Sequence, residues 1–258
     1  MSSIKPASRP APATSPTGWQ DCDLIVVGHG SESCPAANAS LKRQAMEINA
    51  RGLFRTVRAA ALHGQPSPER ALRGLAQGKT FIVPLFMCGG TTVRDAVPKA
   101  FGLDGPITET GQGKIFMCKP AGLAAGMTDL IDARARKLAS VHGLRTNEAT
   151  LLLISHGSPR DPSSWQATER HAAQLRHREF GSVRTAYLHQ APEIEEILNE
   201  LTGPVMAVGL FAGRGRHAGL EIPCLLENAN ENVFDLGPIS SGSGLGDLVI
   251  EQVAAVQH

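Results

Sequence analysis

Three histidines in the second half of the chain each follow an apolar run. His156, His189 and His217 lie at or just beyond the ends of runs that are typical of buried β-strands. In an open α/β sheet, the loops at the carboxyl ends of parallel strands converge on one crevice. Imidazole nitrogens are good ligands for divalent cobalt, nickel, iron and zinc. The spacing therefore predicts a catalytic metal site formed by these side chains, against the alternative that each merely makes a hydrogen bond within its loop.

Other side chains near these histidines are suited to a charged substrate. A neutral imidazole is also a base near pH 7, so a site that binds a divalent ion and accepts protons could exchange the two pyrrole N–H protons of a tetrapyrrole for the metal. Guanidinium groups bind carboxylates bidentately. The candidates for binding a polycarboxylate substrate are Ser158, Arg160, Arg184, Arg214 and Arg216. The alternative for each arginine is a position on a solvated loop surface.

Glycines flank two of the three histidines. Gly157 follows His156, and Gly213 and Gly215 precede His217. Because glycine adopts backbone conformations that other residues avoid, we expect these glycines to turn the chain sharply and leave each imidazole facing the crevice.

The first half of the chain repeats the pattern. His29 and His63 stand 127 and 126 residues before the first two histidines of the second half, and Thr92 stands where the third would be. A near-constant offset over several motifs predicts the duplication of a whole α/β unit. Because a threonine hydroxyl is a poor ligand for these metals, we expect the first unit to be structural or to form the other wall of the cleft. His29 and His63 are secondary candidates for the site.

Apolar runs alternate with helical patterns along both halves. The predicted strands span 24–28, 57–62, 79–87, 114–118, 150–155, 183–188, 205–211 and 232–236, and the predicted helices span 35–54, 66–76, 95–101, 123–138, 165–178, 192–201, 222–228 and 245–256. This alternation predicts an α/β protein of two similar halves, each a parallel four-stranded sheet with helices on both faces. We expect a disordered tail over 1–20, a first half over 21–143 and a second half, which carries the metal site, over 149–258.

Composition excludes several classes of protein. The net charge of +1 and an aromatic content of 4% give no reason to expect a nucleic-acid partner. The apolar runs are shorter than the roughly 18 residues of a membrane span, so we expect no membrane partner. The five cysteines form no CxxC pair and are interpreted as reduced, mostly buried thiols of a cytoplasmic protein. No phosphate-binding loop is present, so we expect neither ATP nor an organic cofactor.

Together these motifs resemble those of the class II chelatases. The resemblance is carried by the apolar run into His156-Gly157-Ser158, by Leu210-Phe211 followed by His217 and Glu221-Ile222-Pro223, and by the duplication. The nearest branch is the two-unit form of the sirohydrochlorin cobalto- and ferrochelatases. The resemblance implies two flavodoxin-like halves with a tetrapyrrole cleft between them, and it matches the family's metal-binding and proton-accepting histidines to His156 and His217.

The chain departs from the family pattern at two points. Leu188-His189 replaces a Leu-Glu pair that is common there, and the full set of histidines lies in the second half rather than in the first. The leading hypothesis is an ATP-independent chelatase that inserts Co²⁺, Fe²⁺ or Ni²⁺, as substrate, into sirohydrochlorin or a related tetrapyrrole. The alternative is a metal or tetrapyrrole carrier without turnover. A hydrolase is disfavoured because no Gly-x-Ser-x-Gly motif is present. We expect a monomer or a homodimer.

Overall fold

The strands of the chain form two separate sheets. The computed structural model describes residues 18–33, 35–229 and 232–256. Sheet one has the strand order β2-β1-β3-β5-β4, and sheet two has the order β7-β6-β8-β9. The strands are β1 (Asp23–Gly30), β2 (Thr56–His63), β3 (Gly78–Pro84), β4 (Ile107–Thr110), β5 (Gly113–Met117), β6 (Thr150–Ser155), β7 (Ser182–Tyr187), β8 (Val205–Gly209) and β9 (Val233–Pro238). Strands β2, β1, β3 and β5 of sheet one run parallel to one another, in the same order as β7, β6, β8 and β9 of sheet two. This agreement confirms the predicted fold class of two similar α/β halves.

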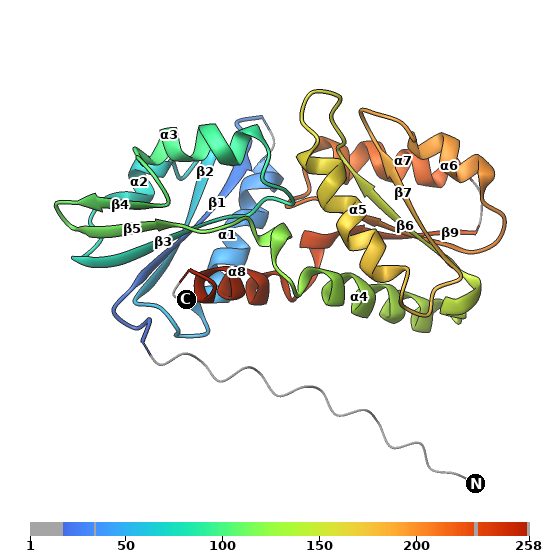
Figure 1. Cartoon of the computed structure of the whole chain (residues 1–258), viewed down its shortest axis with the longest axis horizontal. Coiled ribbons are helices and arrows are strands. Elements are labelled where there is room, and N and C mark those ends of the chain that lie inside the picture. The colour runs from blue at the N-terminus through green and yellow to red at the C-terminus, as the bar shows by residue number, and fades with distance from the viewer. Residues whose placement is uncertain (1–17, 34, 230–231, 257–258) are drawn as a thin grey trace, which may run out of the picture.

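Helices cover both faces of each sheet (Figure 1). The helices are α1 (Pro35–Asn49), α2 (Pro68–Leu72), α3 (Val97–Phe101), α4 (Met127–His142), α5 (Ser163–Leu175), α6 (Ile194–Glu200), α7 (Ile222–Glu227) and α8 (Leu245–Ala254), with the short turns η1 (Thr92–Ala96), η2 (Ala121–Leu123), η3 (Thr146–Glu148), η4 (His217–Glu221) and η5 (Ile239–Ser241). Local sequence sets several ends. Ser67 caps α2 by accepting a hydrogen bond from the Arg70 amide, and Gly143 ends α4 in a left-handed conformation with φ of 67°.

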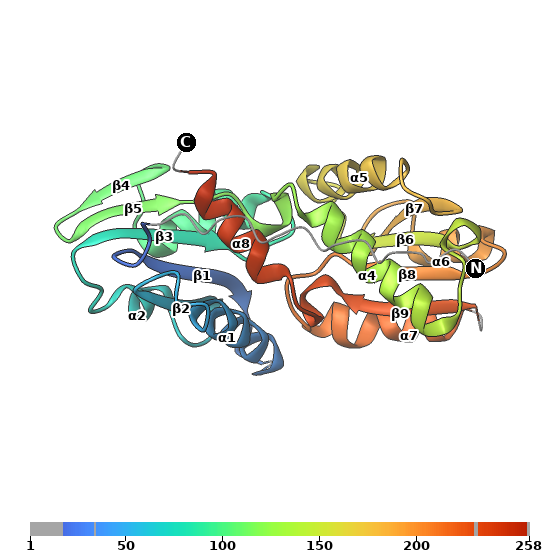
Figure 2. The ribbon, with the colours of Figure 1, turned by 90° about the horizontal axis from the view of Figure 1, so that it is seen from below.

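The last helix of each half packs on the sheet of the other half. Helix α4 follows sheet one along the chain but packs on β8, β9 and α5 of sheet two. Helix α8 follows sheet two but packs on β3 and α1 of sheet one (Figure 2). Glu251 of α8 joins the two exchanged helices, because its carboxylate accepts hydrogen bonds from the backbone amides of Ala125 and Gly126 at the start of α4.

One hydrophobic core therefore runs through both halves. Leu24 of β1 and Leu151 of β6 belong to the same buried cluster, which also contains Ile131 of α4 and Val249 of α8. The opposite face of each sheet has a smaller core of its own, under α2 and α3 in the first half and under α6 and α7 in the second. The boundaries 21–143 and 149–258 stay a prediction for the two repeats along the sequence. In space the repeats are interleaved, because the last helix of each packs on the sheet of the other.

Two expectations are corrected by the structure. Sheet one has a fifth strand, β4, which pairs antiparallel with β5, so it is neither four-stranded nor fully parallel. Short strands in a hairpin leave little periodic signal, which is why β4 was not predicted. The expected disordered tail over 1–20 extends too far, because Trp19 is 1% exposed and stacks on Phe54. Residues 1–17 of that tail lie outside the described residues.

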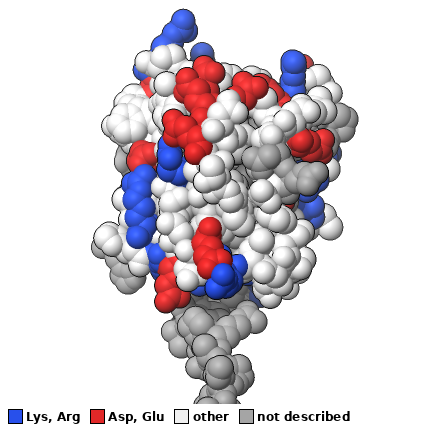
Figure 3. Space-filling view, turned by 90° about the vertical axis from the view of Figure 1, so that its right-hand side faces the viewer, with Lys and Arg blue, Asp and Glu red and all other residues white. Residues whose placement is uncertain are grey.

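The surface at the far end of the second half is mixed in charge. Acidic and basic side chains are interspersed among neutral ones on the face shown in Figure 3. Such mixing is typical of a solvated surface. Among the helices that the structure describes, none is both long enough and apolar enough to cross a bilayer.

Candidate metal centre

The structure brings His156, His189 and His217 together at the carboxyl edge of sheet two. One ligand nitrogen from each residue lies within 4.8 Å of the others. His156 directly follows β6, His189 lies two residues beyond the end of β7, and His217 opens the π-helical turn η4 after β8. Each of three parallel strands is thus followed by one histidine of the cluster. Three convergent nitrogen donors, two of them on exposed residues, suit a transition-metal ion that keeps free coordination positions.

Backbone contacts fix the loop that carries His156. Gly157 has φ of 64°, and a Cβ built there would lie 2.6 Å from Cγ of Gln190, so only glycine fits. The Gln190 side chain accepts a hydrogen bond from the Ser158 amide at 2.7 Å. The His189 amide donates to the carbonyl of His156 at 3.0 Å, which joins the two histidine loops. The first two imidazoles are therefore positioned as one unit.

Phe211 and the other imidazoles surround the ring of His156. The Phe211 ring centroid lies 5.0 Å away in an edge-on arrangement. Although part of the His156 side chain reaches solvent, desolvation lowers its pKa to about 4, and the nearby charges of His217, His189 and His29 act in the same direction. His156 is therefore neutral at pH 7, which leaves a nitrogen lone pair free to bind a metal ion or a proton.

Glu221 orients the third histidine and was not among the predicted site residues. Nδ1 of His217 donates a hydrogen bond to Oε2 of Glu221 at 2.6 Å. This bond assigns the proton to Nδ1 and leaves the Nε2 lone pair free. The hydrogen bond from His217 also lowers the pKa of Glu221. The sequence signal that could have found this pair is the four-residue spacing of His and Glu, which places both side chains on one face of a helical turn.

The predicted substrate-binding residues divide into two groups. Arg160, on the loop after His156, and Arg216, which directly precedes His217, are both exposed. Nε of Arg214 donates to Oγ of Ser241 at 3.0 Å. Oγ of Ser158 accepts hydrogen bonds from the amides of Arg160 and Asp161, so this hydroxyl stabilises its own loop. The structure does not bring Arg184 to the histidines. It lies in β7, three residues before the end of that strand, and pairs with Glu200 at 2.6 Å.

The first half holds an incomplete copy of this arrangement. The rings of His29 and His63 lie with centroids 4.7 Å apart, and Nδ1 of His29 donates to the carbonyl of Gly30 at 3.0 Å. Thr92 opens the π-helical turn η1, as His217 opens η4. His29 is close enough to His156 to lower its pKa. His29 of the first half therefore lies near the histidines of the second half. We expect the cleft between the two halves at this place and call it the crevice.

The expected role of two glycines is not supported. Gly213 and Gly215 do not have a positive φ, and a Cβ at either position would meet nothing within 4 Å. The loop before His217 therefore does not require glycine for its conformation. The sequence pattern led to the wrong expectation because the presence of a glycine does not by itself require a positive φ.

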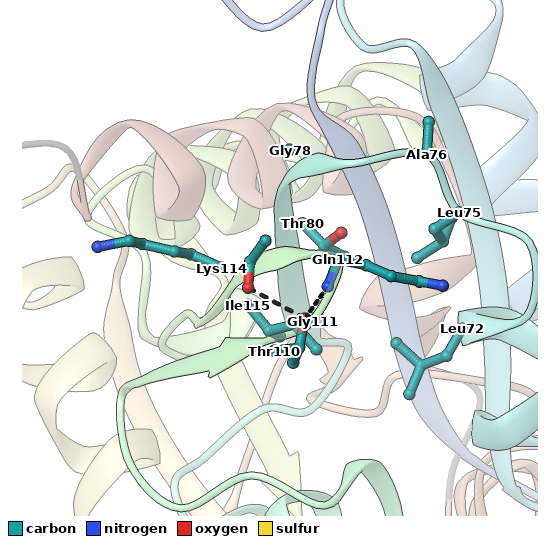
Figure 4. Close-up of a pocket in the computed structure, with 11 residues that line it drawn as sticks. Leu72, Leu75, Ala76, Gly78, Thr80, Thr110, Gly111, Gln112, Lys114 and Ile115 are labelled. Carbon is teal, nitrogen blue, oxygen red and sulfur yellow. Dashed lines mark hydrogen bonds between the residues drawn. The ribbon is translucent and has the colours of Figure 1, made fainter.

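A separate cavity of about 270 Å³ lies between α2 and the β4–β5 hairpin (Figure 4). Leu72, Leu75 and Thr110 are among its lining residues, and Lys114 is the one ionisable side chain in the lining. Lys114 forms an ion pair with Glu109 at 2.8 Å. This cavity therefore offers no set of metal ligands and lies apart from the histidines.

The sequence is similar to that of known proteins. A family model described as CbiX matches residues 23–138 and 150–255, once in each half. A probable sirohydrochlorin cobaltochelatase of Halobacterium salinarum is 28% identical over 221 residues, which cover 78% of this chain and 75% of that protein.

Solved structures share the fold. DR2241 from Deinococcus radiodurans, a multi-domain protein with structural similarity to chelatases, has a TM-score of 0.78 at 24% identity, and the match covers 90% of this chain but 54% of that protein. CbiX, described as the terminal enzyme of siroheme biosynthesis in denitrifying bacteria, has a TM-score of 0.75 at 24% identity over 90% of this chain and 98% of its own. SirB from Bacillus subtilis with Fe³⁺ has a TM-score of 0.71 at 19% identity over 90% and 94%.

Proposed function

The chain belongs to the CbiX family of class II chelatases, and from this premise we propose that it inserts a divalent metal ion into sirohydrochlorin or a related polycarboxylate tetrapyrrole without ATP. The observation that carries the proposal is the convergence of His156, His189 and His217 on one point beside the crevice. The similarity to a probable sirohydrochlorin cobaltochelatase supports the choice of macrocycle.

The metal ion is a substrate that the three imidazoles hold before insertion. Neutral imidazole suits Co²⁺, Fe²⁺ and Ni²⁺, and it distinguishes poorly among them. Three ligands leave coordination positions open, so the pyrrole nitrogens can approach the ion while it is still bound. The cobaltochelatase relative favours Co²⁺, and the iron that accompanies SirB favours iron as a second choice.

Protons leave the macrocycle as the metal enters. Two pyrrole N–H bonds break, the four ring nitrogens bind the ion, and two protons must be accepted. As the ion moves away, the imidazoles of His156 and His217 lose their ligand and become free bases. His217 is the stronger acceptor in this scheme, because the Glu221 carboxylate stabilises an imidazolium at 2.6 Å. His189 serves as the third metal ligand or as a proton relay.

The walls of the crevice bind the acidic arms of the macrocycle. Arg160, Arg214 and Arg216 lie near the histidines, and their guanidinium groups match carboxylates. Arg184 has no part in this proposal, because its partner is Glu200. His29 and His63 form the facing wall in the first half and stay secondary candidates.

An anaerobic insertion assay tests the proposed function. Sirohydrochlorin is mixed with Co²⁺, Fe²⁺ or Ni²⁺ in turn, and the absorption spectrum of the macrocycle is followed with catalytic amounts of protein. We expect multiple turnovers with at least one ion and their loss in His217→Ala. The exposed His177, outside the site, supplies the control His177→Ala. Insertion by His217→Ala at the rate of the unmodified protein would contradict the site, and stoichiometric binding without turnover would identify a carrier.

A further inference from the structure

Asp161 lies at the point where the two halves meet beside the crevice. Its Oδ2 atom accepts three hydrogen bonds from the first half, from the amide of Thr91, the hydroxyl of Thr91 and the guanidinium of Arg94, each at 3.0 Å. The Asp161 side chain is 19% exposed. Three donors on one partly buried carboxylate oxygen make a charge-assisted contact that is stronger than an ordinary surface ion pair.

The other oxygen of the same carboxylate serves the second half. Oδ1 of Asp161 accepts a hydrogen bond from the Ser163 amide at 3.0 Å, at the start of α5. Hydrogen bonds from Ser163 and from Thr91 lower the pKa of Asp161, so the carboxylate is ionised at neutral pH. The Asp161 carboxylate thus stabilises its own loop through Oδ1 and binds the first half through Oδ2.

The two loops are also packed closely around this contact. A Cβ at Gly90 would lie 3.1 Å from Oγ of Ser163 and 3.5 Å from Oδ2 of Asp161. The same Ser163 hydroxyl lies 3.8 Å from the sulfur of Cys88. Polar bonds and steric fit therefore agree that the loop 88–94 docks against the loop 158–163.

The positions of these loops connect the contact with the metal centre. Asp161 follows His156 by five residues in the same loop, and Thr91 directly precedes Thr92, which stands in the place of His217. We propose that Asp161, Thr91 and Arg94 form a clamp that fixes the width of the crevice, so that the first half contributes a positioning contact at the place where the second half contributes a metal ligand. The inference rests on the proposed function, since the crevice is taken to be the macrocycle site.

We expect the clamp to affect the binding of the macrocycle but not the binding of the metal ion. The three metal-binding histidines all lie in the second half, so their affinity for an ion does not depend on a bond to the first half. The macrocycle, in contrast, contacts both walls. If the walls are not held together, its binding must supply the free energy of closing them. Loss of the clamp therefore raises KM for the tetrapyrrole more than it lowers kcat or the affinity for the metal.

The variant Asp161→Asn tests the clamp with little other change. Asparagine keeps an oxygen that can accept from the Ser163 amide, but its NH₂ group cannot accept from Thr91 and Arg94. Amide hydrogen exchange of the whole protein should become faster in 88–94 and in 158–163 together. In the insertion assay, KM for sirohydrochlorin should rise by about tenfold, the effect of one charged hydrogen bond. The dissociation constant of Co²⁺ alone, followed by its visible absorption, should stay within about twofold of the unmodified protein.

A matched substitution elsewhere supplies the control. Asp247 of α8 pairs with Arg51 in the first half, at the opposite end of α1 from the crevice. Asp247→Asn breaks this ion pair and should change neither the amide hydrogen exchange of 88–94 nor KM for sirohydrochlorin.

Two results would overturn the clamp. One is faster amide hydrogen exchange in 158–163 alone, which would limit the role of Asp161 to its own loop. The other is a loss of Co²⁺ affinity as large as the rise in KM. If the unmodified protein inserts no metal, the proposed function fails, while the exchange in 88–94 still decides whether Asp161 holds the two halves together.

Discussion

Glu221 contacts the proposed metal centre through one hydrogen bond, to His217. Within the part of the chain that the structure describes, His217 is the only histidine whose imidazole is hydrogen-bonded to Glu221, and the bond is made by Nδ1. A carboxylate behind a metal-binding histidine fixes the tautomer and the ring orientation, and it raises the basicity of the nitrogen that faces the ion. Side chains of this kind influence affinity without touching the metal.

Replacing Glu221 should therefore weaken metal binding without unfolding the protein. Glu221→Ala leaves the His217 ring free to rotate and removes the neighbouring charge. We expect the affinity for Co²⁺ to fall by about ten- to a hundredfold, the usual effect of losing such a partner. Titration with Co²⁺, followed by visible absorption, measures the change. Glu227→Ala, an exposed position at the end of α7, is the control and should have no effect. An unchanged affinity in Glu221→Ala would exclude this role.

At the scale of elements, the ends of the strands decide which side chains meet. Gly30 and Gly157 follow the first histidine of each half and have φ of 68° and 64°. Both glycines bring the chain close to the neighbouring strand, because a Cβ at Gly30 would lie 2.3 Å from the carbonyl of His63. A turn of this shape stops each strand and leaves the preceding imidazole at the edge of the sheet.

Gly157→Ala should disturb the metal centre, whereas Gly213→Ala should not. The first substitution forces a left-handed backbone on alanine, at a cost of about 1–2 kcal/mol, and adds a clash with Gln190. The second places a methyl group in open space. We expect a lower thermal midpoint and weaker Co²⁺ binding in Gly157→Ala only. Calorimetry and titration of both variants make the comparison, and equal behaviour would show that the turn at Gly157 does not position His156.

At the scale of the whole molecule, exchange of α4 and α8 ties the two halves together. Each helix buries its apolar face on the sheet of the other half, so neither sheet is covered by its own repeat alone. Burial of apolar area is the main stabilising contribution to such packing. The two halves therefore share one hydrophobic core.

A chain that ends at Gly244 lacks α8 and tests whether this helix stabilises the sheet of the other half. Hydrogen exchange should become faster first in β1 and β3 of the first half, because α8 covers that sheet. Strands β6 and β8, which precede α8 more closely in sequence, should keep more of their protection. The opposite order, with β6 and β8 losing protection first, would mean that α8 stabilises its own repeat.

The buried His171 links stability to pH. Its Nε2 donates to the carbonyl of Gly122 and its Nδ1 lies 3.0 Å from the hydroxyl of Thr128, so α5 is joined to η2 and α4. Burial lowers the pKa of His171 to about 4 from an ordinary value of 6.5. The unfolded chain therefore binds a proton first as the pH falls. The stabilisation is present above pH 6.5 and is lost toward pH 4, by up to about 3 kcal/mol.

Denaturant unfolding between pH 7 and pH 4 measures this loss. In His171→Gln, which keeps a donor and an acceptor, the free energy of unfolding should fall less steeply with decreasing pH. The exposed His177→Gln is the control and should keep the original slope. If His171→Gln keeps that slope as well, another group is responsible.

The sequence alone was sufficient for the repeat, the alternation of strands and helices, and the three histidines at strand ends. These features depend on local patterns, since apolar periodicity and fixed offsets can be read within short segments. The strand β6 was predicted with its observed bounds of Thr150–Ser155. The parallel order of strands then required loops at one edge to converge, so the meeting of the histidines could be anticipated.

Only the tertiary structure decided which parts of the two repeats touch. An amphipathic helix shows that one face must be covered, but not by which sheet, so the exchange of α4 and α8 was not predictable. The bond from Asp161 to Thr91 joins residues 70 positions apart, and nothing in either local pattern specifies the partner. Local sequence patterns therefore determined the elements and the three histidines at strand ends, while long-range packing determined the shared core and the contact between Asp161 and the first half.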